Sequence, residues 1–186
     1  MFYGGMSNAT STLVFSGPYT EDDFDTGAGS IIMGDVITGL KVFRDELFVF
    51  CESSIYKIAG TSSSNFAKAE VAKGIGTLAH HSIQEIGGDI LFLGPDGIRS
   101  LSATDKIGDF GLAVTSKQIQ DEVTNFVNRN TSFSSLVIRE KELLYLFQTS
   151  YERMVTEPTF CALLFNVQST RARWAFCGNF SNTFTQ

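Results

Sequence analysis

The feature that most constrains the fold is a short pattern that occurs three times along the chain. One or two apolar residues lead into a polar turn that ends on an acidic residue, and four consecutive apolar residues follow. The three copies occupy residues 41–50, 84–93 and 137–146. Their acidic residues, Glu46, Asp89 and Glu142, are 43 and 53 positions apart. Apolar runs on both sides of a short polar turn are typical of antiparallel β-hairpins.

Further short runs of β-branched and aromatic residues lie around each copy, separated by turn-forming residues. The predicted strands are Val36–Phe43, Leu47–Cys51, Ile55–Ile58, Ser82–Ile86, Ile90–Leu93, Ile98–Leu101, Ser135–Arg139, Leu143–Thr149, Phe160–Phe165 and Ala172–Cys177. Units of four antiparallel strands that repeat every ~40–50 residues are typical of β-propeller blades. We therefore predict an all-β, propeller-like single domain over residues 1–186, with antiparallel four-stranded blades at approximately 36–72, 79–113 and 133–178. A β-sandwich is the alternative, because its hairpins follow the same pattern.

An inserted helix, predicted over residues 116–127, accounts for the longer second unit. Its apolar side chains fall on one face: Ile119, Val123, Phe126 and Val127. Thr115 and Gln118 have the spacing of a capping box at its start.

The segment Thr12–Ser16 also has the character of a strand, and it ends at the turn signal Gly17-Pro18. Because no strand-like segment precedes it, we interpret it as the last strand of a blade that is missing from the chain. Three blades do not close a ring of the ~4–8 that propellers use. The chain is therefore predicted to be part of a larger propeller, or to have its sheets completed by a neighbouring subunit in a homo-oligomeric ring.

The composition argues against several classes of function. The net charge is −6, and no basic run is longer than Arg171-Ala172-Arg173, so neither sequence-specific nucleic-acid binding nor binding to an anionic membrane is expected. No apolar run approaches the ~20 residues of a membrane helix.

The aromatic residues are 17 Phe, five Tyr and one Trp, and Phe needs no polar partner when it is buried. The aromatic residues are therefore expected to serve mainly in the core or in interfaces.

The cysteines and the N-terminus bear on the compartment. Cys51, Cys161 and Cys177 show no CxxC spacing and leave one cysteine without a partner, which predicts reduced thiols rather than a disulfide framework. Met1–Gly5 lacks the charged and apolar regions of a signal peptide, so cytosolic synthesis is expected.

Two groups of residues are candidate metal ligands. His80 and His81 are adjacent, and adjacent residues of a strand point to opposite faces, so a shared metal is not expected. The acidic loop Glu21, Asp22, Asp23 and Asp25 carries the oxygen ligands that Ca²⁺ prefers, but without the spacing of an EF-hand. A solvated loop is the preferred interpretation, and cation binding stays open.

Candidate catalytic motifs are weaker still. Gly74–Ala79 has the letters of a dinucleotide-binding fingerprint, yet a predicted strand follows it where that motif requires a helix. Asp45-Glu46 and Asp96-Gly97 are predicted to be hairpin turns. A pair of catalytic carboxylates stays possible in principle, but no pair stands out. We expect no enzyme activity, no catalytic or metal site and no cofactor.

The chain resembles the β-propeller proteins of bacteriophage virions, a family that includes the nozzle or tail-tube proteins of short-tailed phages and related neck and tail components. The residues that carry the resemblance are Phe15-Ser16-Gly17-Pro18, Phe24-Asp25 and the segments 27–31, 37–50, 53–60, 76–83 and 89–98. The resemblance is good over about residues 12–101 and looser elsewhere. The family's nozzle proteins are several times longer than this chain.

The resemblance implies a structural protein of the virion, located in the tail or neck around the DNA ejection path and made in the host cytoplasm. Its partners would be other tail and neck proteins. The acidic balance is compatible with this function, since a negative wall repels DNA phosphates. The alternative is a receptor- or glycan-binding propeller, for which Trp174 and the five tyrosines are the candidate stacking residues.

Overall fold

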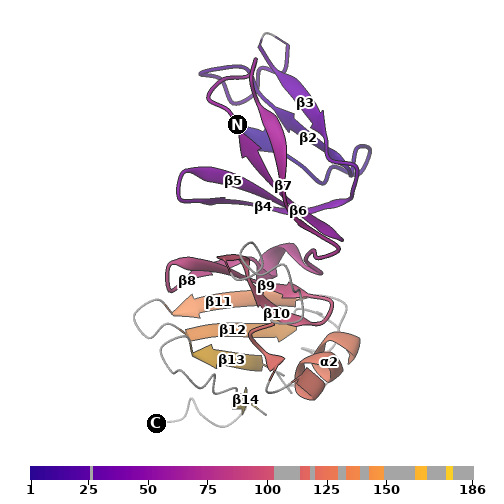
Figure 1. Cartoon of the computed structure of the whole chain (residues 1–186), viewed down its shortest axis with the longest axis vertical. Helices are drawn as coiled ribbons and strands as arrows, with labels where there is room; N and C mark the ends of the chain where they lie inside the picture. The colour runs from indigo at the N-terminus through magenta and orange to yellow at the C-terminus, as the bar shows by residue number, and fades with distance from the viewer. Residues whose placement is uncertain are drawn as a thin grey trace. The chain divides into compact units, whose positions relative to one another are not determined.

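The computed structural model describes residues 1–25, 27–102, 114–117, 120–129, 133–138, 143–148, 162–166 and 175–177. Over these ranges the protein is mostly β-structure, in antiparallel sheets of three or four strands, with a short α-helix (Figure 1). The chain divides into two compact units, Met1–His80 and His81–Gln186. The predicted all-β class with a short helix is thus confirmed, and closure into a propeller stays a prediction.

The first unit begins with a three-stranded sheet in the order β1-β2-β3. Its strands are β1 (Phe2–Tyr3), β2 (Thr12–Phe15) and β3 (Gly29–Ile32). The interpretation of Thr12–Ser16 as a strand without preceding partners is therefore wrong, because β2 is the central strand of this sheet. β1 was not anticipated because it has only two residues and is followed by Gly4-Gly5.

A four-stranded meander in the order β4-β5-β6-β7 follows. Its strands are β4 (Ile37–Phe43), β5 (Glu46–Cys51), β6 (Ser54–Ala59) and β7 (Ala67–Lys73). The first three confirm the predicted strands to within one residue at each end. β7 was missed because alanine, lysine and glutamate dominate it, and these residues are depleted in strands. It is an exposed edge strand, where charged side chains protect the open edge from unwanted pairing.

The core of the first unit joins these two sheets. Its buried members are Leu13, Met33, Ile37, Val49, Cys51 and Ile58. Phe48 and Phe50, on the other face of β5, are buried as well, so this strand is covered on both sides. Lys68 of β7 adds a polar tie, because its Nζ donates to the backbone oxygens of Ile32 and Met33, each at 2.9 Å.

The second unit begins with a three-stranded sheet in the order β10-β9-β8. Its strands are β8 (Gln84–Ile86), β9 (Asp89–Gly94) and β10 (Gly97–Ser100). Ser82 was predicted to begin a strand, but it belongs to the 3-10 turn His80–Ser82. The buried Ser82 hydroxyl accepts a hydrogen bond from the backbone N–H of Leu93 at 3.1 Å, so a side chain supplies the acceptor that a longer strand would have offered.

The last sheet has the order β11-β12-β13-β14. Its strands are β11 (Phe133–Ile138), β12 (Leu143–Gln148), β13 (Ala162–Asn166) and β14 (Ala175–Cys177). These strands overlap the four that the sequence predicts in this region. The remaining predicted residues at their ends, such as Arg139 and Thr149, lie outside the described ranges.

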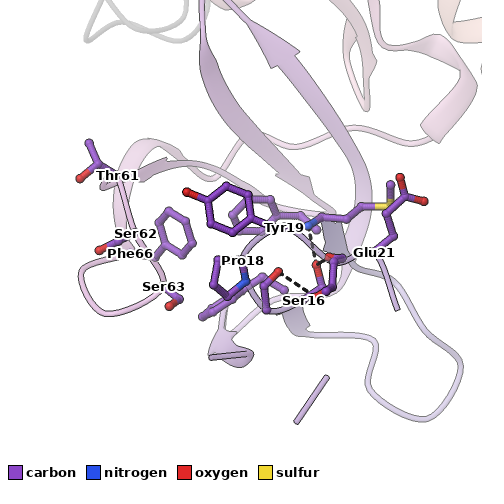
Figure 2. A pocket seen from close by; sticks show the side chains of 13 residues that line it. Ser16, Pro18, Tyr19, Glu21, Thr61, Ser62, Ser63 and Phe66 are labelled. Atoms are coloured by element: carbon purple, nitrogen blue, oxygen red, sulfur yellow. Dashed lines mark hydrogen bonds between the residues drawn. The ribbon is translucent and has the colours of Figure 1, made fainter. Parts of the chain in front are cut away.

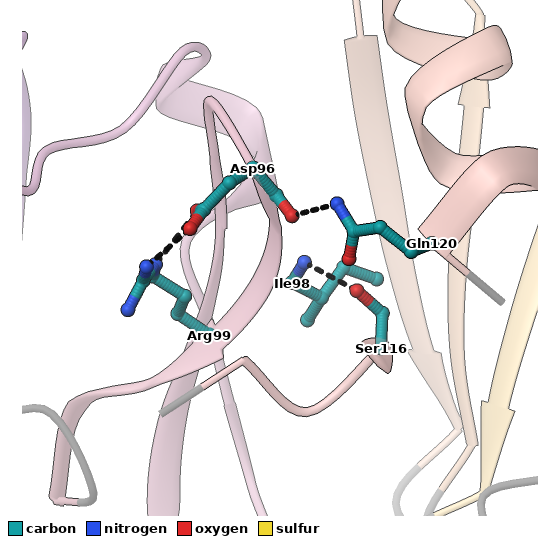
Figure 3. A network of polar contacts seen from close by, with 5 residues as sticks. All are labelled: Asp96, Ile98, Arg99, Ser116 and Gln120. Atoms are coloured by element: carbon teal, nitrogen blue, oxygen red, sulfur yellow. Dashed lines mark hydrogen bonds and ion pairs between the residues drawn. The ribbon is translucent and has the colours of Figure 1, made fainter. Parts of the chain in front are cut away.

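The helix α2 spans Gln120–Arg129, so it begins later and ends later than the predicted 116–127. Val123 and Phe126 are buried on one face, as predicted, whereas Ile119 and Gln118 lie outside the described residues. The difference at the start has a physical reason, which Figure 3 shows. Ser116 lies before the helix, and its Oγ accepts a hydrogen bond from the N–H of Ile98 at 3.0 Å.

Two further contacts, both to Asp96, fix the β9–β10 hairpin. The Gln120 amide donates to the backbone oxygen of Asp96, and the buried Arg99 guanidinium donates to the Asp96 carboxylate, with Nε 2.8 Å from Oδ1 (Figure 3). The hairpin closes at Gly94 and Gly97 around Pro95-Asp96, so Asp96 lies in a turn, as predicted, and Gly97 is the first residue of β10.

Candidate functional site

Two loops of the first unit form the walls of a pocket, and the first of them is residues 16–23. Three hydrogen bonds fold it back on itself. Ser16 Oγ donates to the Thr20 oxygen at 2.7 Å, Thr20 Oγ1 donates to the Gly17 oxygen at 3.3 Å, and the Gly17 N–H donates to the Asp23 oxygen at 2.8 Å. At its tip Tyr19 is fully exposed and has a φ of 66°, a conformation that costs energy for a residue with a side chain.

The second loop, residues 60–66, connects β6 to β7. Gly60 has a φ of 126°, and a Cβ at this position would lie 2.6 Å from the Asn65 backbone oxygen, so glycine is required there. Asn65 Oδ1 accepts hydrogen bonds from the N–H groups of Thr61 and Ser62 at 2.9 and 2.8 Å. These hydrogen bonds tie the two ends of the loop together.

Three phenylalanines from different elements form the floor between the loops. The ring centroid of Phe2 lies 5.8 Å from that of Phe15 and 5.2 Å from that of Phe66, and Phe15 and Phe66 meet edge to face at 5.1 Å. Gly29 makes room for this cluster, since a Cβ there would lie 2.6 Å from the Phe15 ring.

The pocket has a volume of about 630 Å³, within the ordinary range of ligand sites. Figure 2 shows the side chains of the 60–66 loop on one side and Glu21 on the other, with Tyr19 and Pro18 between them. Its rim is rich in hydroxyl groups, and among the described residues no lysine, arginine or histidine side chain lines it. The Met1 amino group, which also lines it, donates to Ser16 Oγ at 2.6 Å.

Two more aromatic residues lie near this rim. Tyr3 and Phe24 are 36% and 46% exposed, and their rings meet edge to face with centroids 5.4 Å apart. Tyr3 also donates its hydroxyl to the Glu21 backbone oxygen at 3.1 Å. Together with Tyr19 they give this part of the first unit three exposed aromatic rings.

The acidic loop contributes one carboxylate, that of Glu21, to the pocket. Glu21 lines the pocket, while Asp23 Oδ1 accepts the N–H of Asp25 at 2.9 Å, as in an ordinary turn. In the described part of the chain no three His, Cys, Asp or Glu side chains are grouped as metal ligands. Cation binding by Glu21, Asp22, Asp23 and Asp25 stays a hypothesis.

The two histidines lie in a 3-10 turn, not in a strand, so the argument from opposite strand faces does not apply to them. Both side chains are exposed. Gly74–Ala79 is followed directly by the 3-10 turn His80–Ser82 and not by the predicted strand, and this three-residue turn is too short to be the helix that a dinucleotide motif opens. Instead Gly76 packs against the backbone of Cys51 and Glu52, where a Cβ would lie 2.1 Å from the Cys51 oxygen.

Four hydrogen bonds converge on the carboxylate of Asp35. Its Oδ2 accepts from Ser53 N, Ser53 Oγ and Ser54 Oγ at 2.9, 2.9 and 2.7 Å, and its Oδ1 accepts from Val36 N at 2.8 Å. Partial burial raises the pKa of Asp35, but these hydrogen bonds outweigh it and the pKa lies below its ordinary value of 3.8. The site ties the start of β4 to the β5–β6 turn.

Cys51 lies near Asp35 and is buried as a free thiol. Its burial, with the negative charge of Asp35, raises the pKa of the thiol to about 11. A thiol that stays protonated at neutral pH is a poor nucleophile, so Cys51 has the properties of a core residue. The side chains of Cys161, Cys177 and Trp174 lie outside what the structure describes.

Comparison with known proteins finds no matching family model and no similar curated protein. Among the described helices none has the length and apolar character needed to cross a membrane. The expected absence of enzyme activity, cofactors and nucleic-acid binding stays a prediction.

Most of the pocket was not predicted from the sequence. Glu21 and Gly17-Pro18 were noted, but Phe66, Tyr19 and the hydroxyl-rich segment 61–63 were not. The run Gly60-Thr61-Ser62-Ser63-Ser64-Asn65 is a clear loop signal. No local pattern shows that this loop meets residues 16–21.

Proposed function

We propose that this chain is a structural component of a bacteriophage virion, an assembly protein of the tail or neck (nozzle-like) around the path of DNA ejection. The observation that carries the proposal is the repeat of one hairpin geometry. Glu46 and Asp89 begin β5 and β9, and Ser54 and Gly97 begin β6 and β10, each pair 43 positions apart. The segments 37–50, 53–60 and 89–98, which carry the resemblance to virion propeller proteins, provide these strands and their turns.

A β-propeller is the fold proposed with this function. Two of the sheets, β4–β7 and β11–β14, have four strands in sequential order, as blades do. The sheet of β8–β10 has three, but Arg99 of β10 also forms an antiparallel bridge with Val114, where a fourth strand would pair. The proposed blades therefore remain approximately 36–72, 79–113 and 133–178, with further blades supplied by other chain segments or by neighbouring subunits in a ring.

Three measurements test this function. Mass spectrometry of purified virions should find the protein in fixed ratio to the tail proteins, and gold-labelled antibodies should mark the tail or neck in electron micrographs. Sedimentation at micromolar concentration should show self-association or binding to neck and tail proteins, through an interface of more than about 1,000 Å². A stable monomer that stays in the cleared lysate and is missing from virions contradicts the proposal.

A receptor- or glycan-binding module is the second candidate, and one observation favours it. The exposed rings of Tyr3, Tyr19 and Phe24 lie close to a pocket with a hydroxyl-rich rim, an arrangement that suits a sugar. Virions without the protein separate the two candidates. If it is structural, tails fail to assemble, whereas loss of a receptor-binding module leaves complete virions that do not adsorb.

A further inference from the structure

We infer that the pocket between the 16–23 and 60–66 loops binds an arginine side chain carried by a protein partner. The inference rests on the proposed function, since an assembly protein makes its lasting contacts with other proteins. It gives that function a specific contact site, built from an aromatic floor, one exposed ring and one carboxylate.

The aromatic residues match the two parts of an arginine side chain. The planar guanidinium stacks on the face of a tyrosine or phenylalanine, and Tyr19 is fully exposed at the edge of the pocket. The methylene stem needs apolar surface, which Phe2 and Phe66 of the floor supply. Lysine fits less well, because its compact ammonium neither stacks nor forms paired hydrogen bonds.

The charge of the pocket also favours a cation. Glu21 lies in the rim, and no cationic side chain pairs with it within the described ranges. Among the described lining residues the positive group is the Met1 amine, which donates to Ser16 and offsets one negative charge. Asp22, Asp23 and Asp25 follow Glu21 along the chain, so the local field attracts a guanidinium and repels phosphates and acidic sugars.

Hydrogen bonds within each loop hold the two walls of the pocket. Ser16, Thr20 and Asp23 tie the first loop, and Asn65 ties the second, through the hydrogen bonds described above. Binding therefore costs little ordering of the protein. The hydroxyl groups of Thr61, Ser62 and Ser63 line the same pocket and offer oxygen acceptors for the guanidinium N–H groups that Glu21 does not bind.

The test uses the full chain and two labelled pentapeptides, one with a central arginine and one with citrulline, its neutral isostere. We expect the citrulline peptide to bind about tenfold more weakly, because it lacks the charge-assisted hydrogen bonds. Glu21→Gln should weaken binding of the arginine peptide by about the same factor. Tyr19→Ala should weaken it roughly two- to fivefold, and Tyr19→Phe, which keeps the ring, should preserve it.

Glu70→Gln on the exposed strand β7 is the matched control, because it removes the same charge from a residue that does not line the pocket. Equal binding of the two peptides, or an equal loss in Glu21→Gln and Glu70→Gln, overturns the inference. So does displacement of the arginine peptide by a neutral trisaccharide such as maltotriose, which would identify a glycan site. These outcomes are independent of virion incorporation, so a failure here leaves the proposed function standing.

Discussion

Two hairpins of this protein adopt the same turn with different residues. Between β4 and β5 the turn residues are Arg44 and Asp45, with φ values of 51° and 63°, and between β8 and β9 they are Gly87 and Gly88, with 60° and 74°. Two positive φ values define the turn whose twist matches that of the strands on either side. Glycine adopts it without steric cost, whereas arginine and aspartate do not. The flanking strands therefore determine the conformation of the turn, and the turn residues change only the free energy that this conformation costs.

Polar contacts differ between the same two sheets. In the first sheet Asp35, before β4, holds the serines of the β5–β6 turn. In the second, Asp89 at the start of β9 accepts hydrogen bonds from the hydroxyls of Ser100 and Ser102 at the end of β10. The strand positions repeat and the polar ties do not, which indicates that buried apolar residues carry the repeat.

The largest expected effect tests those apolar residues directly. Phe50 and Leu93 occupy equivalent positions, 43 residues apart, and both are 0% exposed. Phe50→Ala should lower the free energy of unfolding by about 3–5 kcal/mol and Leu93→Ala by about 2–5 kcal/mol, because each leaves a cavity. Urea unfolding measures both, with Val42→Ala, at a position that is 64% exposed, as the control. A loss below about 1 kcal/mol at either site would mean that its side chain contributes little to the core of its own unit.

The polar ties come next in size. Asp89→Ala should cost about 1–3 kcal/mol, since it leaves the Ser100 and Ser102 hydroxyls and the Ile90 N–H without their acceptor. Thermal unfolding of this variant and of the double variant Ser100→Ala/Ser102→Ala measures the effect. The three hydrogen-bonded residues act as one unit if the serine double variant loses as much stability as Asp89→Ala, and if the variant that combines all three substitutions loses no more than either. Strict additivity would mean that Asp89 acts through other contacts.

The fold was predictable where burial and turns leave strong local patterns. The strands β4, β5, β6 and β9 have consecutive β-branched or aromatic residues between polar turns, and each was located to within a residue at its ends. β7 was not predicted because the pairing surface of β6, rather than its own residues, determines it. The residues of Ala67–Lys73 pair with Ser54–Ala59 in an antiparallel ladder despite their weak β-propensity.

The helix and the pocket show two other limits. The start of α2 shifted because Ser116 is used as a partner of Ile98, a contact between residues 18 positions apart. The pocket depends on Phe2 and Phe15, which pair within one sheet, and on Phe66, which meets them only after the two sheets of the first unit have packed together. Local periodicity carries no information about such contacts. The acidic loop was noticed, but its aromatic neighbours are what suggest a ligand.

The turns offer a smaller and sign-specific test. Asp45→Gly should stabilise the protein by about 0.5–1 kcal/mol, because it relieves the positive φ at that position. Gly88→Asp should destabilise it by about 1 kcal/mol through backbone strain alone, since a Cβ at Gly88 meets nothing within 4 Å. Chemical denaturation of both variants measures the difference. The same sign for both changes would show that something other than backbone conformation decides these turns.

The smallest expected effect is the pH dependence of the Asp35 tie. Its pKa in the folded chain lies below the ordinary value of 3.8 because the hydrogen bonds from Ser53, Ser54 and Val36 favour the charged form. A depressed carboxylate pKa contributes stability that is present above the unfolded value and is lost as the pH falls through the folded value. The melting temperature of the wild type should therefore exceed that of Asp35→Asn near neutral pH, and the two should approach each other below about pH 4.

Glu70→Gln, which removes an exposed carboxylate on β7, controls for the loss of charge in general. If the gap between wild type and Asp35→Asn stays constant down to about pH 2.5, the tie depends on the shape of the side chain and not on its charge. In that case Asp35 and Asp89 would differ in the geometry of the hydrogen bonds that they accept and not in the effect of their charge.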